Sequence, residues 1–101
     1  MATVTSKVLV RAAAGTSTAT LYTVPASTTT VVTNIVVTNS AATAATFTLT
    51  LNSVDIFTTT AIAANSTAMF DLKQVLTTTK IIAGLASAIT VKFHISGVEI
   101  V

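Results

Sequence analysis

The chain has 101 residues, a mass of 10.3 kDa and a formal net charge of +2, which suits one domain and leaves no room for two. Apolar residues make up 51% of it and charged residues 8%, so intrinsic disorder and a charged coiled coil are both excluded. Without cysteine, a disulfide-stapled fold is excluded as well. Threonine and alanine fill 40 of the 101 positions, and the 23 threonines favour β-structure.

Short runs of β-forming residues begin the chain, and Gly, Pro, Asn and Ser separate them. The first two predicted strands are residues 3–10 and 18–24, and Pro25 closes the second because proline cannot donate to a sheet ladder. The third, residues 29–38, carries Val and Ile on both sides and is predicted to be buried on both faces. Asn39 ends it.

The fourth run has the most regular alternation in the chain, with apolar residues on one face and threonines on the other. The apolar members are Phe47, Leu49 and Leu51. Asn52 and Ser53 then predict a hairpin turn into residues 54–57. Residues 58–62 continue that strand or bend away from it.

The last third of the chain predicts three further strands. Residues 67–72 form one of them, and residues 73–76 are predicted to form a single helical turn. A short strand follows at residues 80–83. The final run, residues 88–96, alternates regularly, and Gly97 predicts a bulge before the last segment. The side chains predicted to point inward from this run are Ile89, Val91, Phe93 and Ile95.

About eight short strands at spacings of about 10 to 12 residues are typical of a sandwich or barrel. We therefore expect an all-β fold over residues 1–101, a single two-sheet antiparallel sandwich of jelly-roll or related topology. Residues 1–15 are expected to serve as an N-terminal arm or contact strand. Because so small a domain with so few charges leaves apolar surface exposed, we also expect self-association.

The sequence holds no constellation typical of an active site. His94 is the only histidine, and a triad would need it beside Asp55 or Asp71 and a hydroxyl. The simpler interpretation places His94 on the solvent side of the last strand. The two aspartates have no spacing that favours a glycosidase pair, and a metal site needs more ligands than the chain supplies. We expect no enzyme, no catalytic or metal-binding residue and no cofactor.

Nucleic acid and membrane are not expected as partners. The five cations are spread along the chain rather than gathered into a basic stripe. The uncharged stretch 12–54 is interrupted by Thr, Ser, Asn and Pro25, whereas a spanning helix needs about 20 mostly apolar residues. A ladder at Thr46, Thr48 and Thr50 is similar to one of the repeats of ice-binding surfaces, but it occurs once, so a half-exposed strand is favoured.

Three segments carry a family resemblance. They read LYTVPA at residues 21–26, VVTNIVVTNSAATAATFTLTLN at 31–52 and AITVKFHISGVEI at 88–100. In this order they resemble small β-sandwich virion proteins of tailed bacteriophages, from about residue 20 onward. The chain departs from that pattern after Pro25, where it reads Ala26-Ser27-Thr28 and many members carry glycine and a charged residue.

The resemblance implies a virion structural protein. The first hypothesis is a capsid decoration or cement protein on the capsid surface. Such a protein binds neighbouring subunits of the major capsid protein and stabilises the shell. Decoration proteins of this size are often homotrimers, and we expect the same here. A tail, collar or fibre component is one alternative. Another is a carbohydrate- or receptor-binding module, which is disfavoured because Tyr22 is the only tyrosine and tryptophan is absent.

Overall fold

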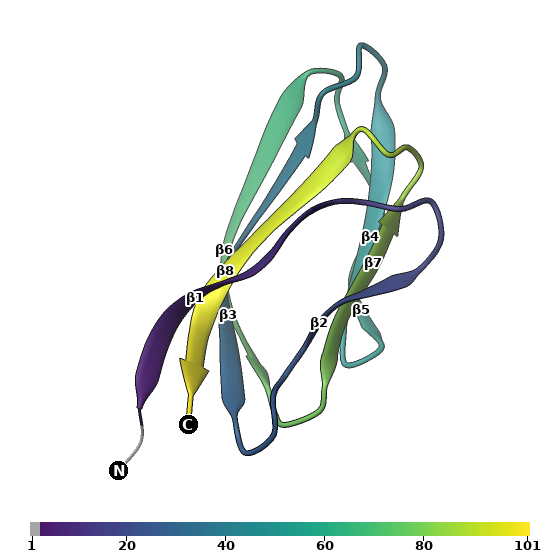
Figure 1. Cartoon of the computed structure of the whole chain (residues 1–101). Coiled ribbons are helices and arrows are strands. Elements are labelled where there is room, and N and C mark those ends of the chain that lie inside the picture. Colours follow the sequence, from purple (N-terminus) through teal and green to yellow (C-terminus); the bar gives the residue numbers. More distant parts are fainter. Residues whose placement is uncertain (1–2) are drawn as a thin grey trace.

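The structure is a computed structural model that describes residues 3–101, and it contains eight β-strands in two facing sheets (Figure 1). The strands are β1 (Val4–Ala13), β2 (Ala19–Thr23), β3 (Thr29–Asn39), β4 (Ala45–Leu51), β5 (Val54–Ile62), β6 (Ser66–Leu76), β7 (Ile81–Ala86) and β8 (Val91–Ile100). Over residues 3–101 no helix is long and apolar enough to cross a membrane.

Each sheet has four antiparallel strands. Sheet A has the order β1-β8-β3-β6 and sheet B the order β2-β7-β4-β5. The chain changes sheet at every connection except the β4–β5 hairpin, where it turns at Asn52 and Ser53 with positive φ at both residues, as a type I′ turn requires. This strand order is that of an eight-stranded jelly roll, so the predicted all-β sandwich and the predicted hairpin are confirmed.

The hydrophobic core lies between the two sheets, and the four phenylalanines form a chain through it. Phe47 on β4 contacts Phe93 on β8 across the core, with ring centroids 6.1 Å apart. Phe47 also meets Phe57 at 5.5 Å, and Phe57 meets Phe70 on β6 at 4.5 Å. Because Phe57 belongs to sheet B and Phe70 to sheet A, this pair closes one side of the sandwich.

The prediction of a helical turn at residues 73–76 is wrong, because β6 continues as a strand to Leu76. Val75 pairs with Val31 and Leu76 with Thr30, beyond an irregularity in the register between β3 and β6. That irregularity takes up the extra residue in β6, so the alternation is broken while the strand continues. A broken alternation in a run of Lys, Gln, Val and Leu is what favoured a helix from the sequence.

Two burial predictions are corrected. Ile89 is 69% exposed, because β8 begins only at Val91 and Ile89 lies in the turn before it. The third run is buried on one face only: Val32 is fully buried, whereas Val31 and Val36 on the opposite face are half-buried. Among residues 3–101 no layer packs on the outer side of sheet A, so its central strand β3 keeps one open face.

Gly97 lies inside a continuous β8, and the register breaks are on its neighbours, between Val8 and Val10 in β1 and between Val32 and Asn34 in β3. A Cβ atom at Gly97 would stand 2.1 Å from the carbonyl oxygen of Val31. The glycine is therefore required by a close approach of backbones, and the predicted bulge belongs to the two adjacent strands.

The segment 1–15 was expected to form an arm or contact strand. Residues 4–13 form β1, which pairs with β8 along its length, and residues 1 and 2 lie outside the described residues. A contact between β1 and another protein stays a prediction.

One buried asparagine holds three loops together at one end of the sandwich. The amide of Asn39 donates to the carbonyl oxygens of Thr43 at 2.9 Å and Ala63 at 3.3 Å. Its side-chain oxygen accepts from the Ala41 N–H and from the Thr90 hydroxyl, both at 3.1 Å. The β3–β4, β5–β6 and β7–β8 connections are thus fixed by one side chain that is 2% exposed.

Candidate functional site

The residues that could carry chemistry lie apart. His94 is on β8 of sheet A, where it pairs with Val36, and Asp71 is on the edge strand β6 of the same sheet. Asp55 is on β5 of sheet B and accepts a hydrogen bond from the Thr58 hydroxyl at 2.9 Å. The structure brings neither the triad nor the carboxylate pair together. Among residues 3–101 no three His, Cys, Asp or Glu gather as metal ligands.

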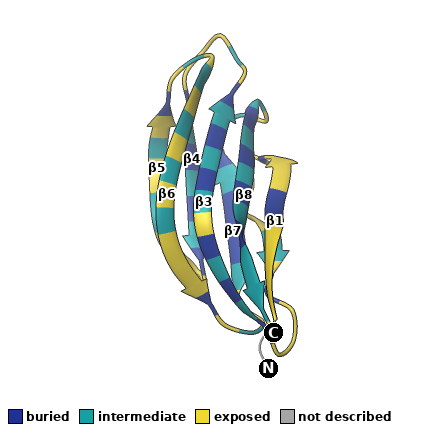
Figure 2. Cartoon of the chain, turned by 90° about the vertical axis from the view of Figure 1, so that its left-hand side faces the viewer, coloured by how far each residue is buried: buried dark blue, intermediate teal, exposed yellow. Residues whose placement is uncertain are grey.

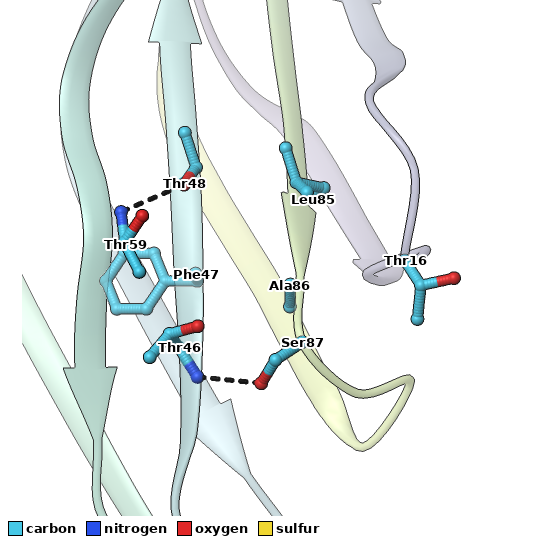
Figure 3. A pocket seen from close by; sticks show the side chains of 8 residues that line it. All are labelled: Thr16, Thr46, Phe47, Thr48, Thr59, Leu85, Ala86 and Ser87. Atoms are coloured by element: carbon cyan, nitrogen blue, oxygen red, sulfur yellow. Dashed lines mark hydrogen bonds between the residues drawn. The ribbon is translucent and has the colours of Figure 1, made fainter.

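A shallow depression on the outer side of sheet B has a volume of about 260 Å³ (Figure 3). It is lined by Thr16, Thr46, Phe47, Thr48, Thr59, Leu85, Ala86 and Ser87. Two of its hydroxyls already accept hydrogen bonds from within the site, because the Thr46 N–H donates to the Ser87 hydroxyl at 2.9 Å and the Thr59 N–H to the Thr48 hydroxyl at 3.0 Å. It is smaller than ordinary ligand sites and holds no titratable group.

The threonine ladder of β4 serves the fold. Thr48 accepts the N–H of Thr59, a residue with φ of 44° at an irregularity in β5. The Thr50 hydroxyl donates to the carbonyl oxygen of Ala83 on β7 at 3.4 Å. Two of the three ladder hydroxyls are thus used to bind neighbouring strands of sheet B, which supports the half-exposed strand over a surface that orders water.

A polar cluster joins the two sheets where β2 faces β8. The Tyr22 hydroxyl lies 2.5 Å from a Glu99 carboxylate oxygen and 2.8 Å from the Thr30 hydroxyl. Lys7 on β1 forms an ion pair with Glu99 at 3.2 Å. Tyr22 belongs to sheet B and the other three residues to sheet A, so the cluster fastens the sheets together at this point. Residues 77 positions apart meet here, and no local sequence pattern predicts such a contact.

The cluster shifts the pKa values of two of its members. Burial, and then the hydrogen bond to the Glu99 carboxylate, raise the pKa of Tyr22 to about 12. The hydrogen bond from Tyr22, aided by Lys7, lowers the pKa of Glu99 below its ordinary value of 4.5. Both shifts favour a neutral phenol that donates to an ionised carboxylate. Every member is engaged within the chain, so the cluster is structural.

The outer face of sheet A faces the viewer in Figure 2. The register places apolar residues at the end of this face where β8 finishes. The register places Val98, Val31 and Val75 side by side across β8, β3 and β6, and Val4 lies opposite Ile100 in the next row. Val4 and Val75 are 62% and 64% exposed, and the other three are partly exposed. Two adjacent rows of apolar side chains therefore lie open on this face.

The upper part of the same face is cationic. Arg11 lies opposite His94 in one row, and Lys92 lies opposite Thr38 in the next. Lys73 is exposed lower down on the edge strand β6, two residues from Val75, and Asp71 is the one carboxylate of that strand. Three cationic side chains and one carboxylate therefore lie on or beside this face.

Sheet B differs in its chemistry. Among the residues of its four strands only Asp55 is charged, whereas the strands of sheet A carry six charged residues. The charged residues are far apart along the chain, and this spacing predicts that they are scattered over the surface. Antiparallel pairing collects them on one sheet, and the apolar rows below them depend on a β6 segment that was predicted to be helical.

The chain matches no family model and no curated protein. Solved structures do match it. One of them is a chain from the crystal structure of the T13 particle of infectious bursal disease virus, with a TM-score of 0.57 and 8% sequence identity. The match covers 98% of the present chain and 30% of the viral chain. A chain from the structure of the Gx strain of the same virus has a TM-score of 0.57 and 14% identity, and covers 98% and 32%.

The chain thus spans about a third of the length of these similar chains. Identities this low show a likeness of fold, which extends over nearly the whole of this chain. Both similar chains come from particles of infectious bursal disease virus, and the resemblance to tailed bacteriophages in particular stays a prediction. What the comparisons establish is an all-β sandwich of a kind that also occurs in a virus particle.

Proposed function

We propose that the protein is a virion structural protein, and most specifically a decoration or cement protein on the capsid surface of a tailed bacteriophage. The observation that carries the proposal is the two-sheet fold of the chain, which is similar to chains of virus particles over 98% of its length. The surface chemistry of sheet A is what directs the proposal to a binding role.

The open face of sheet A supports a binding role. Val4 and Val75 are more than half exposed within a patch that crosses the sheet. Exposed apolar patches on small soluble domains mark contacts with other proteins. The dispersal of His94, Asp55 and Asp71 over two sheets supports a protein that binds without catalysing a reaction.

The proposed action follows from linkage. A protein that binds neighbouring major-capsid subunits only in the assembled shell stabilises that shell by mass action. Self-association as a homotrimer would add avidity, because each bound copy raises the effective concentration of the next. No cofactor, nucleic acid or membrane takes part in this proposal.

Counting copies in purified particles tests the proposal. A decoration protein is expected in a fixed ratio to the major capsid protein, which quantitative mass spectrometry of whole particles measures. A few copies per particle would favour the tail, collar or fibre alternative. Absence of the protein from purified particles would overturn the virion role.

A further inference from the structure

We propose that the outer face of sheet A is the surface that docks on the shell, and that it fits a protein surface with an apolar strip beside a row of carboxylates. This inference rests on the proposed function and adds to it the docking face and the chemistry of the partner. It is carried by the two-part character of this face, apolar around Val31 and Val98 and cationic around Arg11 and Lys92.

The charges of the face point to an acidic partner. Arg11, Lys73 and Lys92 stand against Asp71 on or beside this face, and Glu99 and Lys7 neutralise each other elsewhere in the sheet. Two copies of the chain stacked face to face would bring six cations and two carboxylates into one interface. Like charges across an interface are costly, whereas carboxylates opposite Arg11 and Lys92 are favourable.

The size of the face also disfavours a second copy. Four strands of about 10 residues span about 19 Å by 33 Å, or about 600 Å². Face-to-face pairing would bury about 1,200 Å² in total, which is at the low end for specific contacts and below the range of obligate dimers. A contact of this size suits a domain that adds to an existing assembly.

The register gives the spacing that the partner needs. Val98 and His94 are four residues apart on β8, so the apolar row and the cationic row are about 14 Å apart. A complementary surface therefore places its carboxylates about 14 Å from the part of its apolar strip that contacts the Val98 row. The face is built on strands, so the backbone positions that carry its side chains are fixed before binding.

Contact through the face is favoured over strand addition at an edge. The edge strands are β1 and β6 in sheet A and β2 and β5 in sheet B, and each has an irregularity in its pairing. Such bulges interrupt the row of free N–H and C=O groups that an added strand needs. β1 then acts as a contact strand through the side chains of Val4, Val8 and Arg11.

Matched valine variants test the apolar part. Val75→Lys places a charge in the apolar row. Val54→Lys makes the same change on sheet B at a valine of similar exposure, 67% for Val54 against 64% for Val75. The probe is purified shells stripped of the protein, with bound protein measured by co-sedimentation. We expect Val75→Lys to weaken binding at least about tenfold and Val54→Lys to change it less than about twofold.

Matched charge variants test the cationic part. Arg11→Glu and Lys80→Glu both lower the net charge by two, but Lys80 lies in the β6–β7 loop. Arg11→Glu is expected to weaken shell binding about tenfold and to reduce its dependence on salt, because a charge-complementary contact is lost. Lys80→Glu is expected to bind as the unaltered protein does. Thermal melting of each variant confirms that it is folded.

The binding results distinguish a failure of the proposed function from a failure of the docking face. If the unaltered protein does not bind the stripped shells, the proposed function is wrong and the docking face falls with it. If it binds, and folded Val75→Lys and Arg11→Glu bind equally well, the function stands and the docking face is wrong. If light scattering shows that Val75→Lys abolishes self-association while shell binding persists, a second copy occupies the face and the inference is overturned.

Discussion

At the scale of single residues, Asn39 shows how a buried polar group replaces hydrophobic packing where three loops meet. Its amide and carbonyl make four hydrogen bonds, to Thr43, Ala63, Ala41 and Thr90, which is the full capacity of the side chain. The loops contain few large apolar residues, so they are held by this side chain. The sequence predicted Asn39 as a strand end and gave no sign of this role, because its partners lie up to 51 positions away.

We expect Asn39→Ala to lower the free energy of unfolding by about 3 kcal/mol, because it leaves several buried backbone groups without partners. Asn34→Ala is the control, since Asn34 is half-exposed on the outer face of sheet A. Its loss is expected to stay below about 1 kcal/mol. Urea denaturation of both variants measures the difference, and equal losses would contradict the role assigned to Asn39.

At the scale of elements, the link between β2 and β8 through Tyr22 and Glu99 predicts a dependence on pH. The pKa of Glu99 is lowered in the folded state, so its contribution to stability is present above the ordinary value of 4.5 and is lost as the pH falls through the folded value. The pKa of Tyr22 is raised from 10.0 to about 12, so its contribution is complete below pH 10 and is lost as the pH rises toward 12.

Urea denaturation below pH 4.5 and between pH 10 and 12 checks both parts of the prediction, with Tyr22→Phe compared with the unaltered protein. Phenylalanine keeps the ring but removes both the titrating hydroxyl and its hydrogen bond to Glu99. The variant is expected to lose less stability between pH 10 and 12, and also less as the pH falls below 4.5. An alkaline loss equal to that of the unaltered protein would show that Tyr22 does not cause it.

A strand could be predicted from the sequence where its apolar and polar residues alternate regularly. β4 was predicted correctly because its apolar face is buried and its threonine face is open, which produces strict alternation from Phe47 to Leu51. The end of β6 was missed because its irregular pairing with β3 breaks that alternation before Val75. Ile89 was misplaced because an apolar residue in a turn has the same local pattern as one in a strand.

At the scale of the whole molecule, composition predicted the sandwich, but the site depends on the order of the strands. Arg11, Lys73 and Lys92 are far apart in the chain, and antiparallel pairing brings Arg11 and Lys92 to one face of sheet A and Lys73 to its edge strand. Strand order is set by contacts between distant segments, and local patterns of apolar and polar residues do not reveal it. The apolar and cationic face could therefore be found only once the sheets were assembled.

The central claim is that the protein binds an assembled shell and stabilises it. The most direct test is the temperature at which purified shells open, measured by light scattering for intact particles, for shells stripped of the protein and for stripped shells to which it is returned. We predict that stripping lowers this temperature and that returning the protein restores it, in proportion to the amount bound. An opening temperature that is the same in all three samples would contradict the claim.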